Sequence, residues 1–400
     1  MESILDVSRQ EEFTDNIIKN SYHAYYPHNT LTINNSDEIR ICINNQNLLT
    51  FPSHSYLHIK GKLNNHTKGH LVNNALSFLF SEIRYLIADK EVDMVRNPGI
   101  TSSMKLVCSA NNAARYSNAC IDLDENLKKF HKDGSFSGCI PLEMLMGFFE
   151  DVNKVIVNVK QELVLKRSKN DNNCILATGT AETDPIPTIT LTEIQWCVPH
   201  ILVSDAEKLS LNRTILSNEP LGLKFRSFEL HEMPAYPNAS TRHTWPVKTT
   251  NQLEKPRYII FGFQTARDGV AKSRSDRYDH CGLKNLKVFL NQEYFPYNDL
   301  NIDFDKNDVA KVFEMFMRFQ GNYYNTSLEP LINRDTYIKE YPLIVVDCSK
   351  QNEEVKEGVV DIKLEIETGA NVAAGTAAYC LIIHQKEFQY KPLTNELNKV

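Results

Sequence analysis

Four histidines between residues 54 and 70 are the first side chains in the sequence that could bind a metal ion. His54 and His58 are four positions apart, as are His66 and His70. This spacing brings two imidazoles to one face only in a helix, whereas the segment alternates as a strand does and then becomes polar. No cysteine or carboxylate completes a ligand set. We interpret these residues as surface loop histidines and predict no metal site.

Asp279, His280 and Cys281 contain the residue types of a cysteine nucleophile and its base. Neighbouring side chains of an extended chain point to opposite faces, so adjacent positions cannot form the contact between a thiol and its base. We interpret this segment as the start of a strand that carries a buried thiol.

Two further features could bind a ligand. The loop at residues 266–280 contains the basic residues Arg267, Lys272, Arg274 and Arg277 and the acidic residues Asp268, Asp276 and Asp279. These charges nearly cancel, which favours a solvated loop over a phosphate site. Trp196 and Trp245 could form a sugar-binding platform with the many tyrosines and phenylalanines, but we interpret them as aromatic residues of a strand core.

The short motifs of several enzyme classes are absent from the sequence. It contains no GxxxxGK[ST], GxGxxG, GxSxG or HExxH segment. We therefore predict that the protein is not an enzyme, and we assign no catalytic, cofactor-binding or metal-binding residues and no cofactor.

Composition narrows the class of protein. A chain of 400 residues exceeds the size of one hydrophobic core, which predicts two domains. The net charge of -6 and the lack of a basic terminal run argue against binding nucleic acid by bulk charge.

The N-terminus carries acidic residues where a signal peptide is basic, and no stretch is apolar enough to span a membrane. Nine scattered cysteines without a CxxC pair indicate reduced thiols in a protein assembled inside cells.

The chain consists mainly of short alternating segments separated by turn residues. Strands are predicted throughout residues 29–63, 82–92, 155–168 and 188–204 of the first half, with the last range taken as a pair of strands. A short helix or turn is expected at 140–151. Residues 94–136 are expected to be mixed and loop-like, with a short helical patch at 122–130. The best helix is residues 307–320, with apolar residues at a spacing near 3.6 and Asp305 or Asn307 as its cap.

The two halves of the chain resemble each other. SYLHIKGKL (55–63) is similar to RYIIFGFQT (257–265), with Gly61 and Gly262 201 positions apart. Other pairs follow in the same order: Ile83 with Leu286, 140–142 with 341–343, 162–166 with 362–366, and 192–202 with 377–387. This order predicts a duplicated domain. The almost wholly apolar later strand should be buried on both faces, whereas the earlier one should expose one face.

These observations predict an all-β fold of two tandem jelly-roll β-sandwiches, with short helices in the loops between strands. The predicted divisions are an N-terminal arm (1–26), a first jelly roll (27–204), a polar connector (205–219), a second jelly roll (220–390) and a C-terminal tail (391–400). Phe13, Ile17 and Ile18 would form an apolar stripe on a short helix of the arm. Two similar domains in one chain would give a trimer six similar edges, the geometry of a shell tile.

Four segments carry a family resemblance: NNALSFLFSEIRYLIADKEVDMVRNPGITSSMK, FFEDVNKVIVNVKQELVLKRSKNDNN, QLEKPRYIIFGFQTAR and DHCGLKNLKVFLNQEYFPY. They resemble the hexon-like double jelly-roll major capsid proteins of Polinton-like and adintovirus-like elements, over about residues 25–390. The resemblance implies homotrimers that act as pseudohexameric capsomers of an icosahedral double-stranded DNA virion. It implies penton or minor capsid proteins as further partners, and a virion location after assembly in the nucleus or cytoplasm of the host cell. It offers no catalytic residues.

Three alternatives remain at this point. A lectin-like carbohydrate-binding or attachment protein could also contain two β-sandwiches. A jelly-roll hydrolase needs only two carboxylates on strand ends that face one cleft, and such a pair has no local motif. A host protein derived from a capsid gene would have the same sequence features.

Overall fold

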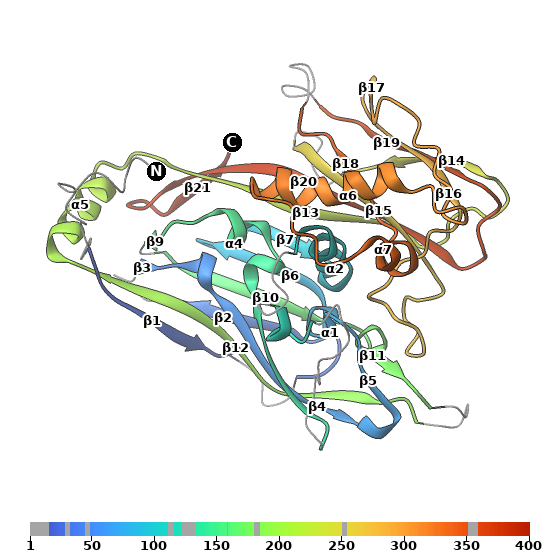
Figure 1. Cartoon of the computed structure of the whole chain (residues 1–400). Helices are drawn as coiled ribbons and strands as arrows, with labels where there is room; N and C mark the ends of the chain where they lie inside the picture. Colours follow the sequence, from blue (N-terminus) through green and yellow to red (C-terminus); the bar gives the residue numbers. More distant parts are fainter. Residues whose placement is uncertain are drawn as a thin grey trace, which may run out of the picture.

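The computed structural model describes residues 16–28, 33–44, 49–110, 116–121, 133–157, 159–179, 185–249, 254–350 and 359–400. Phe13 and the helical patch expected at 122–130 lie outside these residues. Strands dominate the described chain, and they form two large pairs of sheets (Figure 1).

The first pair of sheets lies between residues 17 and 203. Its larger sheet has the order β8 (Ser135–Pro141), β4 (Tyr56–Asn64), β12 (Thr188–Val203), β3 (Leu49–Thr50) and β9 (Ile156–Val157), and β1 (Ile17–Tyr25) also pairs with β12. Its smaller sheet has the order β2 (Glu38–Ile43), β10 (Gln161–Arg167), β6 (Phe80–Ile87) and β7 (Lys90–Arg96). The short strands β5 (Gly69–Leu71) and β11 (Ile175–Ala177) form a separate pair.

The second pair of sheets lies between residues 221 and 399. One sheet has the order β13 (Leu221–Met233), β20 (Thr376–Lys391), β15 (Lys255–Thr265) and β18 (Ile344–Asp347), and β21 (Glu396–Lys399) also pairs with β20. The other has the order β14 (Arg242–Val247), β19 (Ile362–Thr368), β16 (Leu283–Leu290) and β17 (Glu293–Phe295).

The two pairs of sheets share one topology. In each larger sheet a long last strand lies between the first strand of its unit and the strand that carries the matched glycine: β12 lies between β1 and β4, and β20 between β13 and β15. The smaller sheets, β2-β10-β6-β7 and β14-β19-β16-β17, have the same succession. This antiparallel arrangement of two sheets is the jelly roll, and the chain contains it twice.

The strand registers correct two of the predicted matches between the halves. When Gly61 is matched with Gly262, Ile59 matches Ile260. Gly138 of β8 pairs with Ile59, and Val345 of β18 pairs with Ile260, so β8 and β18 are equivalent strands with an offset of 207 residues. The match of 140–142 with 341–343 is therefore wrong by six residues.

The second correction is one residue. Because Ile83 matches Leu286, Tyr85 matches Val288. Leu163 pairs with Tyr85 and Leu364 pairs with Val288, so Leu163 corresponds to Leu364. The predicted match of 162–166 with 362–366 is therefore one position out. Because side chains alternate between faces, this shift exchanges buried and exposed positions.

Burial of the two glycine-bearing strands confirms the predicted contrast. Residues 258–264 of β15 are all buried, whereas β4 alternates between buried and more exposed positions. Both glycines are needed for close packing: a Cβ at Gly61 would lie 2.6 Å from the Phe136 ring, and one at Gly262 would lie 2.6 Å from Leu343.

The helices are mostly short and lie in the loops between strands. They are α1 (Ala75–Phe78), α2 (Pro98–Ser109), α4 (Gly147–Asp151), α5 (Asp205–Leu216), α6 (Ala310–Tyr324) and α7 (Arg334–Glu340), with the 3-10 turns η2 (Pro52–His54), η3 (His66–Lys68), η4 (Leu142–Met144) and η5 (Asn172–Cys174). The predicted helix at 307–320 is confirmed as α6, although Val309 precedes it and no side chain caps it.

Three local predictions were wrong. The segment expected to continue a helical arm is the strand β1, which pairs with β12 along its length. Residues 98–109, expected as part of a loop, form α2. The range 188–204, expected as two strands, contains the single strand β12. In addition, the polar segment after Ser204 is helical, because Ser204 caps α5 by accepting a hydrogen bond from the Glu207 backbone N–H.

Candidate functional site at the junction of the two jelly rolls

The four histidines singled out from the sequence do not form a metal site. His54 and His70 are exposed, and His58 of β4 lies 3.1 Å from the Ser137 hydroxyl. Among the described residues, the one group of three or more potential ligands close enough to share an ion is Glu229, Glu254 and His384. Sequence reasoning missed this group.

The Asp279–Cys281 segment is structural. Asp279 accepts hydrogen bonds from the Thr265 backbone N–H and from Arg267, and the His280 ring stacks on Phe304. Burial raises the pKa of the Cys281 thiol, which disfavours the thiolate that a nucleophile needs.

The charged loop at 266–280 is more ordered than the predicted solvated loop. Arg274 pairs with Asp276 at 2.7 Å, and Arg277 pairs with Glu340. Asp276 is buried, so this loop is a packed network of ion pairs. The expectation of a solvated loop is wrong because its charges pair with one another, as in Arg267 with Asp279, and with Glu340 of α7.

The tryptophans and most of the cysteines belong to the interior. Trp196 and Trp245 are both buried, as the sequence predicted, so neither can form a surface platform for a sugar. All nine cysteines are free thiols, and six are buried: Cys108, Cys120, Cys174, Cys197, Cys348 and Cys380.

An ion pair between Arg226 of β13 and Asp151 of α4 links the second jelly roll to the first. The Arg226 Nε lies 2.8 Å from Asp151 Oδ2, Nη2 lies 2.5 Å from Oδ1, and the Arg226 backbone N–H also donates to this carboxylate. Nη1 donates to the Tyr323 carbonyl, and the guanidinium lies 3.5 Å from the centre of the Tyr323 ring. The bidentate geometry fixes both the distance and the orientation of the two elements.

A second ionic contact lies beside it. Lys105 of α2 is buried and approaches Glu150 of α4 at 2.5 Å. The hydroxyls of Tyr323 and Tyr324 in α6 each donate to Glu150 at 2.7 Å. Because burying an unpaired charge is costly, this cluster holds α2, α4 and α6 in one arrangement.

Backbone contacts make the junction tight. The Gly147 Cα of α4 packs on β13 so closely that a Cβ there would lie 1.4 Å from the Arg226 carbonyl oxygen. Tyr390 of β20 donates a hydrogen bond to the Val157 carbonyl at 3.0 Å, and Gln320 of α6 donates to the Ala110 carbonyl at 2.9 Å. Figure 1 shows β13 running beside α4 and β7, with α2 and α6 close together at one end of the contact.

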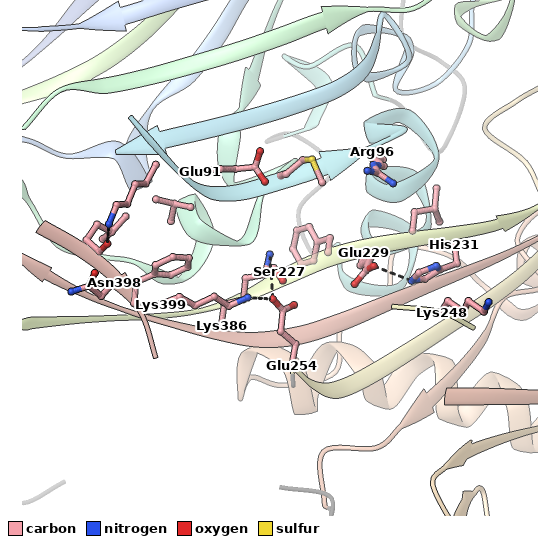
Figure 2. Close-up of a pocket in the computed structure, with 17 residues that line it drawn as sticks. Glu91, Arg96, Ser227, Glu229, His231, Lys248, Glu254, Lys386, Asn398 and Lys399 are labelled. Atoms are coloured by element: carbon pink, nitrogen blue, oxygen red, sulfur yellow. Dashed lines mark hydrogen bonds and ion pairs between the residues drawn. The ribbon is translucent and has the colours of Figure 1, made fainter. Parts of the chain in front are cut away.

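A cavity of about 500 Å³ opens along the same junction (Figure 2). Its walls come from β7 of the first jelly roll and from β13, β20 and β21 of the second. The charged residues that line it are Lys90, Glu91, Arg96, Glu229, Lys248, Glu254, Lys386 and Lys399. Asp93 of β7 is fully buried nearby, and burial raises its pKa to about 6.

The junction can fix two equivalent sandwiches as one rigid body. The residues that the sequence offered for catalysis are dispersed or engaged in structural contacts, as described above. No helix within the described ranges is long and apolar enough to cross a membrane.

Known structures have the same fold. The chain is similar to a chain of the PBCV-1 virus capsid at 11% identity and a TM-score of 0.59, covering 98% of each chain. It is similar to the mavirus major capsid protein at 8% identity and a TM-score of 0.56, covering 99% of this chain and 92% of that one. The Faustovirus major capsid protein matches at 7% identity and a TM-score of 0.58, covering 97% and 93%.

Sequence comparison gives the family. No curated protein matches the chain in sequence. The sequence profile of the double jelly roll-like domain matches residues 69–387, which is more than half of the chain. With two jelly rolls of the same topology in the structure, the chain belongs to the double jelly roll-like domain family.

Proposed function

We propose that this protein is the major capsid protein of a virus or virus-like element. The observation that carries the proposal is the rigid joining of two jelly rolls with the same strand order in one chain. The fold likeness to the mavirus and Faustovirus major capsid proteins, over nearly the full length of both chains, supports the same role.

The geometry favours a trimer. Three copies around an axis would present six similar sandwiches, which is the outline of a pseudohexameric tile. A tile of this kind needs the two sandwiches of each chain at a fixed angle. The contacts of half-buried Arg226 and of buried Lys105 supply that rigidity, and this role needs no catalytic group.

The surface of α5 also supports self-association. None of its twelve residues is buried, and Leu209 and Leu216, which lie on one face two turns apart, are 61% and 70% exposed. A helix of this length is marginal in water without tertiary packing. We propose that another copy of the chain covers this apolar face in the capsomer.

The finer assignment is part of the same proposal. The capsid is icosahedral and encloses double-stranded DNA, and the lineage is the Polinton-like and adintovirus-like one that the strand segments resemble. The partners are other copies of the chain and penton or minor capsid proteins, without specific recognition of nucleic acid. We further propose 205–219 as the connector between the two jelly rolls and the virion as the location.

Sedimentation of the purified chain tests this function. The expected species has three times the 45.9 kDa mass of one chain. A species of single-chain mass at every protein concentration, salt concentration and pH would contradict the proposal.

A further inference from the structure

The register of the second jelly roll brings two glutamates and a histidine to one face of a sheet. His384 of β20 lies opposite Ser227 of β13 on one side and Pro256 of β15 on the other. Glu229 is two residues after Ser227, and Glu254 is two residues before Pro256. Because side chains two positions apart share a face, both carboxylates are directed to the side of the sheet that carries the His384 ring.

The distances within this cluster suit a metal ion. One ligand atom from each of Glu229, Glu254 and His384 lies within 4.8 Å of the other two. His384 Nε2 is 3.1 Å from Glu229 Oε2. Two ligand atoms bound to one tetrahedral zinc ion are about 3.3 Å apart, since each lies about 2 Å from the metal.

The buried histidine provides an independent observation. His384 has no exposed surface, and neither of its ring nitrogens has a hydrogen-bond partner of good geometry among the described residues. A buried polar atom without a hydrogen-bond partner destabilises the folded protein. Nε2 lies 3.1 Å from Glu229 Oε2 without the geometry of a hydrogen bond, and an ion between these two atoms would bind both.

We propose that Glu229, Glu254 and His384 form a binding site for a divalent transition-metal ion of the zinc class. One imidazole and two carboxylates match this class better than calcium or magnesium, which prefer oxygen ligands alone. The site is distinct from the contacts that support the capsid role, and it does not depend on that role.

Neighbouring side chains complete the arrangement. His231 Nε2 lies 3.3 Å from Glu229 Oε1, the carboxylate oxygen that is not the one beside His384. Lys399 of the C-terminal strand contacts Glu254, and Lys386 lies 3.9 Å from the same oxygen. Figure 2 shows Lys386 and Lys399 directed toward Glu254, and Glu229 directed toward His231. The two lysines neutralise Glu254 when no ion is bound.

The cavity at the junction gives an ion access to the site. Glu229 and Glu254 both line it, while His384 lies buried in the sheet behind them. A bound ion would join β13, β20 and the chain that leads into β15, on the side of the sheet that faces β7. Since the unfolded chain lacks this geometry, binding would stabilise the folded protein.

Calorimetric titration of the chelator-treated full chain with Zn²⁺ tests the site. We expect one saturable Zn²⁺ per chain, a rise in the thermal midpoint on binding, and no comparable binding of Ca²⁺ or Mg²⁺. Glu229→Gln keeps the shape of the side chain but removes its charge, and it should weaken Zn²⁺ binding at least about tenfold. His384→Ala should have the same effect, whereas His58→Ala, which removes a histidine of the first jelly roll, should leave binding unchanged.

Lys399→Ala separates a metal site from a merely structural cluster. It removes a cation that competes for Glu254, so Zn²⁺ should bind more tightly in this variant. Absence of saturable binding to the folded wild-type chain would overturn the proposal, as would Zn²⁺ binding that Glu229→Gln leaves unchanged. Equal or weaker affinity in Lys399→Ala would refute the role given to Glu254. These results are read from metal affinity, so they are independent of the mass of the assembly.

Discussion

Arg226 and Lys105 decide how the two jelly rolls meet, because each places a cation against a carboxylate at a site largely closed to water. Arg226 is 23% exposed and its partner Asp151 is 17% exposed. By comparison, Arg318 and Glu314, which pair on α6, are 66% and 46% exposed. Ion pairs in water contribute little to stability, whereas removing one partner of a buried pair leaves a charge without compensation.

We therefore expect Arg226→Ala to lower the free energy of unfolding by about 3 kcal/mol. The matched variant Arg318→Ala should lower it by less than about 1 kcal/mol. Urea denaturation of the two variants and the wild-type chain measures the difference. Equal losses in both variants would show that the junction does not depend on this pair.

His200 makes the pairing of β1 with β12 sensitive to acid. Burial and then the neighbouring His23 lower its pKa to about 4, and its Nε2 lies 2.8 Å from the Tyr25 hydroxyl. The unfolded chain takes up a proton at a pH near 6.5, whereas the folded chain does so only near 4. The stability associated with His200 is therefore complete above about pH 6.5 and is lost as the pH falls toward 4.

His200→Gln should reduce this loss. The change in denaturation midpoint between about pH 7 and about pH 5 should be smaller in the variant than in the wild-type chain. Asp93 has the opposite effect, because its raised pKa makes stability fall as the pH rises from about 4 to about 6. That contribution is common to both proteins and cancels in the comparison, so an identical pH dependence in both would contradict the account.

At the scale of elements, alternation of residues predicted most strands and the 3.6-residue spacing predicted α6. Periodicity did not predict α2, because all twelve of its residues are buried and its serines and lysine therefore mark no exposed face. It also failed at β1, where Ile17 and Ile18 suggested a helical stripe but are exposed in a strand. The spacing of apolar residues reveals a helix or a strand only when one face of the segment is buried and the other is exposed.

The metal-ligand cluster could not be predicted for a different reason. Glu229, Glu254 and His384 are far apart in the sequence, and each is surrounded by ordinary strand residues. They meet through the register of β13, β20 and β15, which alternation alone does not define. The junction contacts depend in the same way on the packing of distant elements.

The contact of α4 with β13 can be tested by a single methyl group. Gly147→Ala should destabilise the protein by at least about 3 kcal/mol, because its Cβ would overlap the Arg226 carbonyl and a backbone atom cannot move aside cheaply. Gly222→Ala on β13 adds the same group where no atom lies within 4 Å. Its effect should stay within about 0.5 kcal/mol.

Thermal denaturation and soluble yield compare the two glycine variants. A Gly147→Ala protein as stable as the Gly222→Ala protein would mean that α4 and β13 are not in close contact.

At the scale of the whole molecule, one chain presents two equivalent sandwiches that the junction contacts hold in a fixed relative orientation. The helix α5 lies at one end of the molecule in Figure 1, away from α6 and α7. The double variant Leu209→Glu and Leu216→Glu should weaken self-association while leaving the denaturation midpoint of the single chain unchanged, since neither leucine is buried. Sedimentation equilibrium measures the first quantity and urea denaturation the second. Unchanged association would exclude α5 from the contact between copies.

Electron microscopy of the purified wild-type chain tests the capsid role most directly. Negatively stained particles should show threefold capsomers with a pseudohexagonal outline, and these should form shells or regular arrays under some conditions of salt and pH. Images that contain only single chains under all of these conditions would contradict the account.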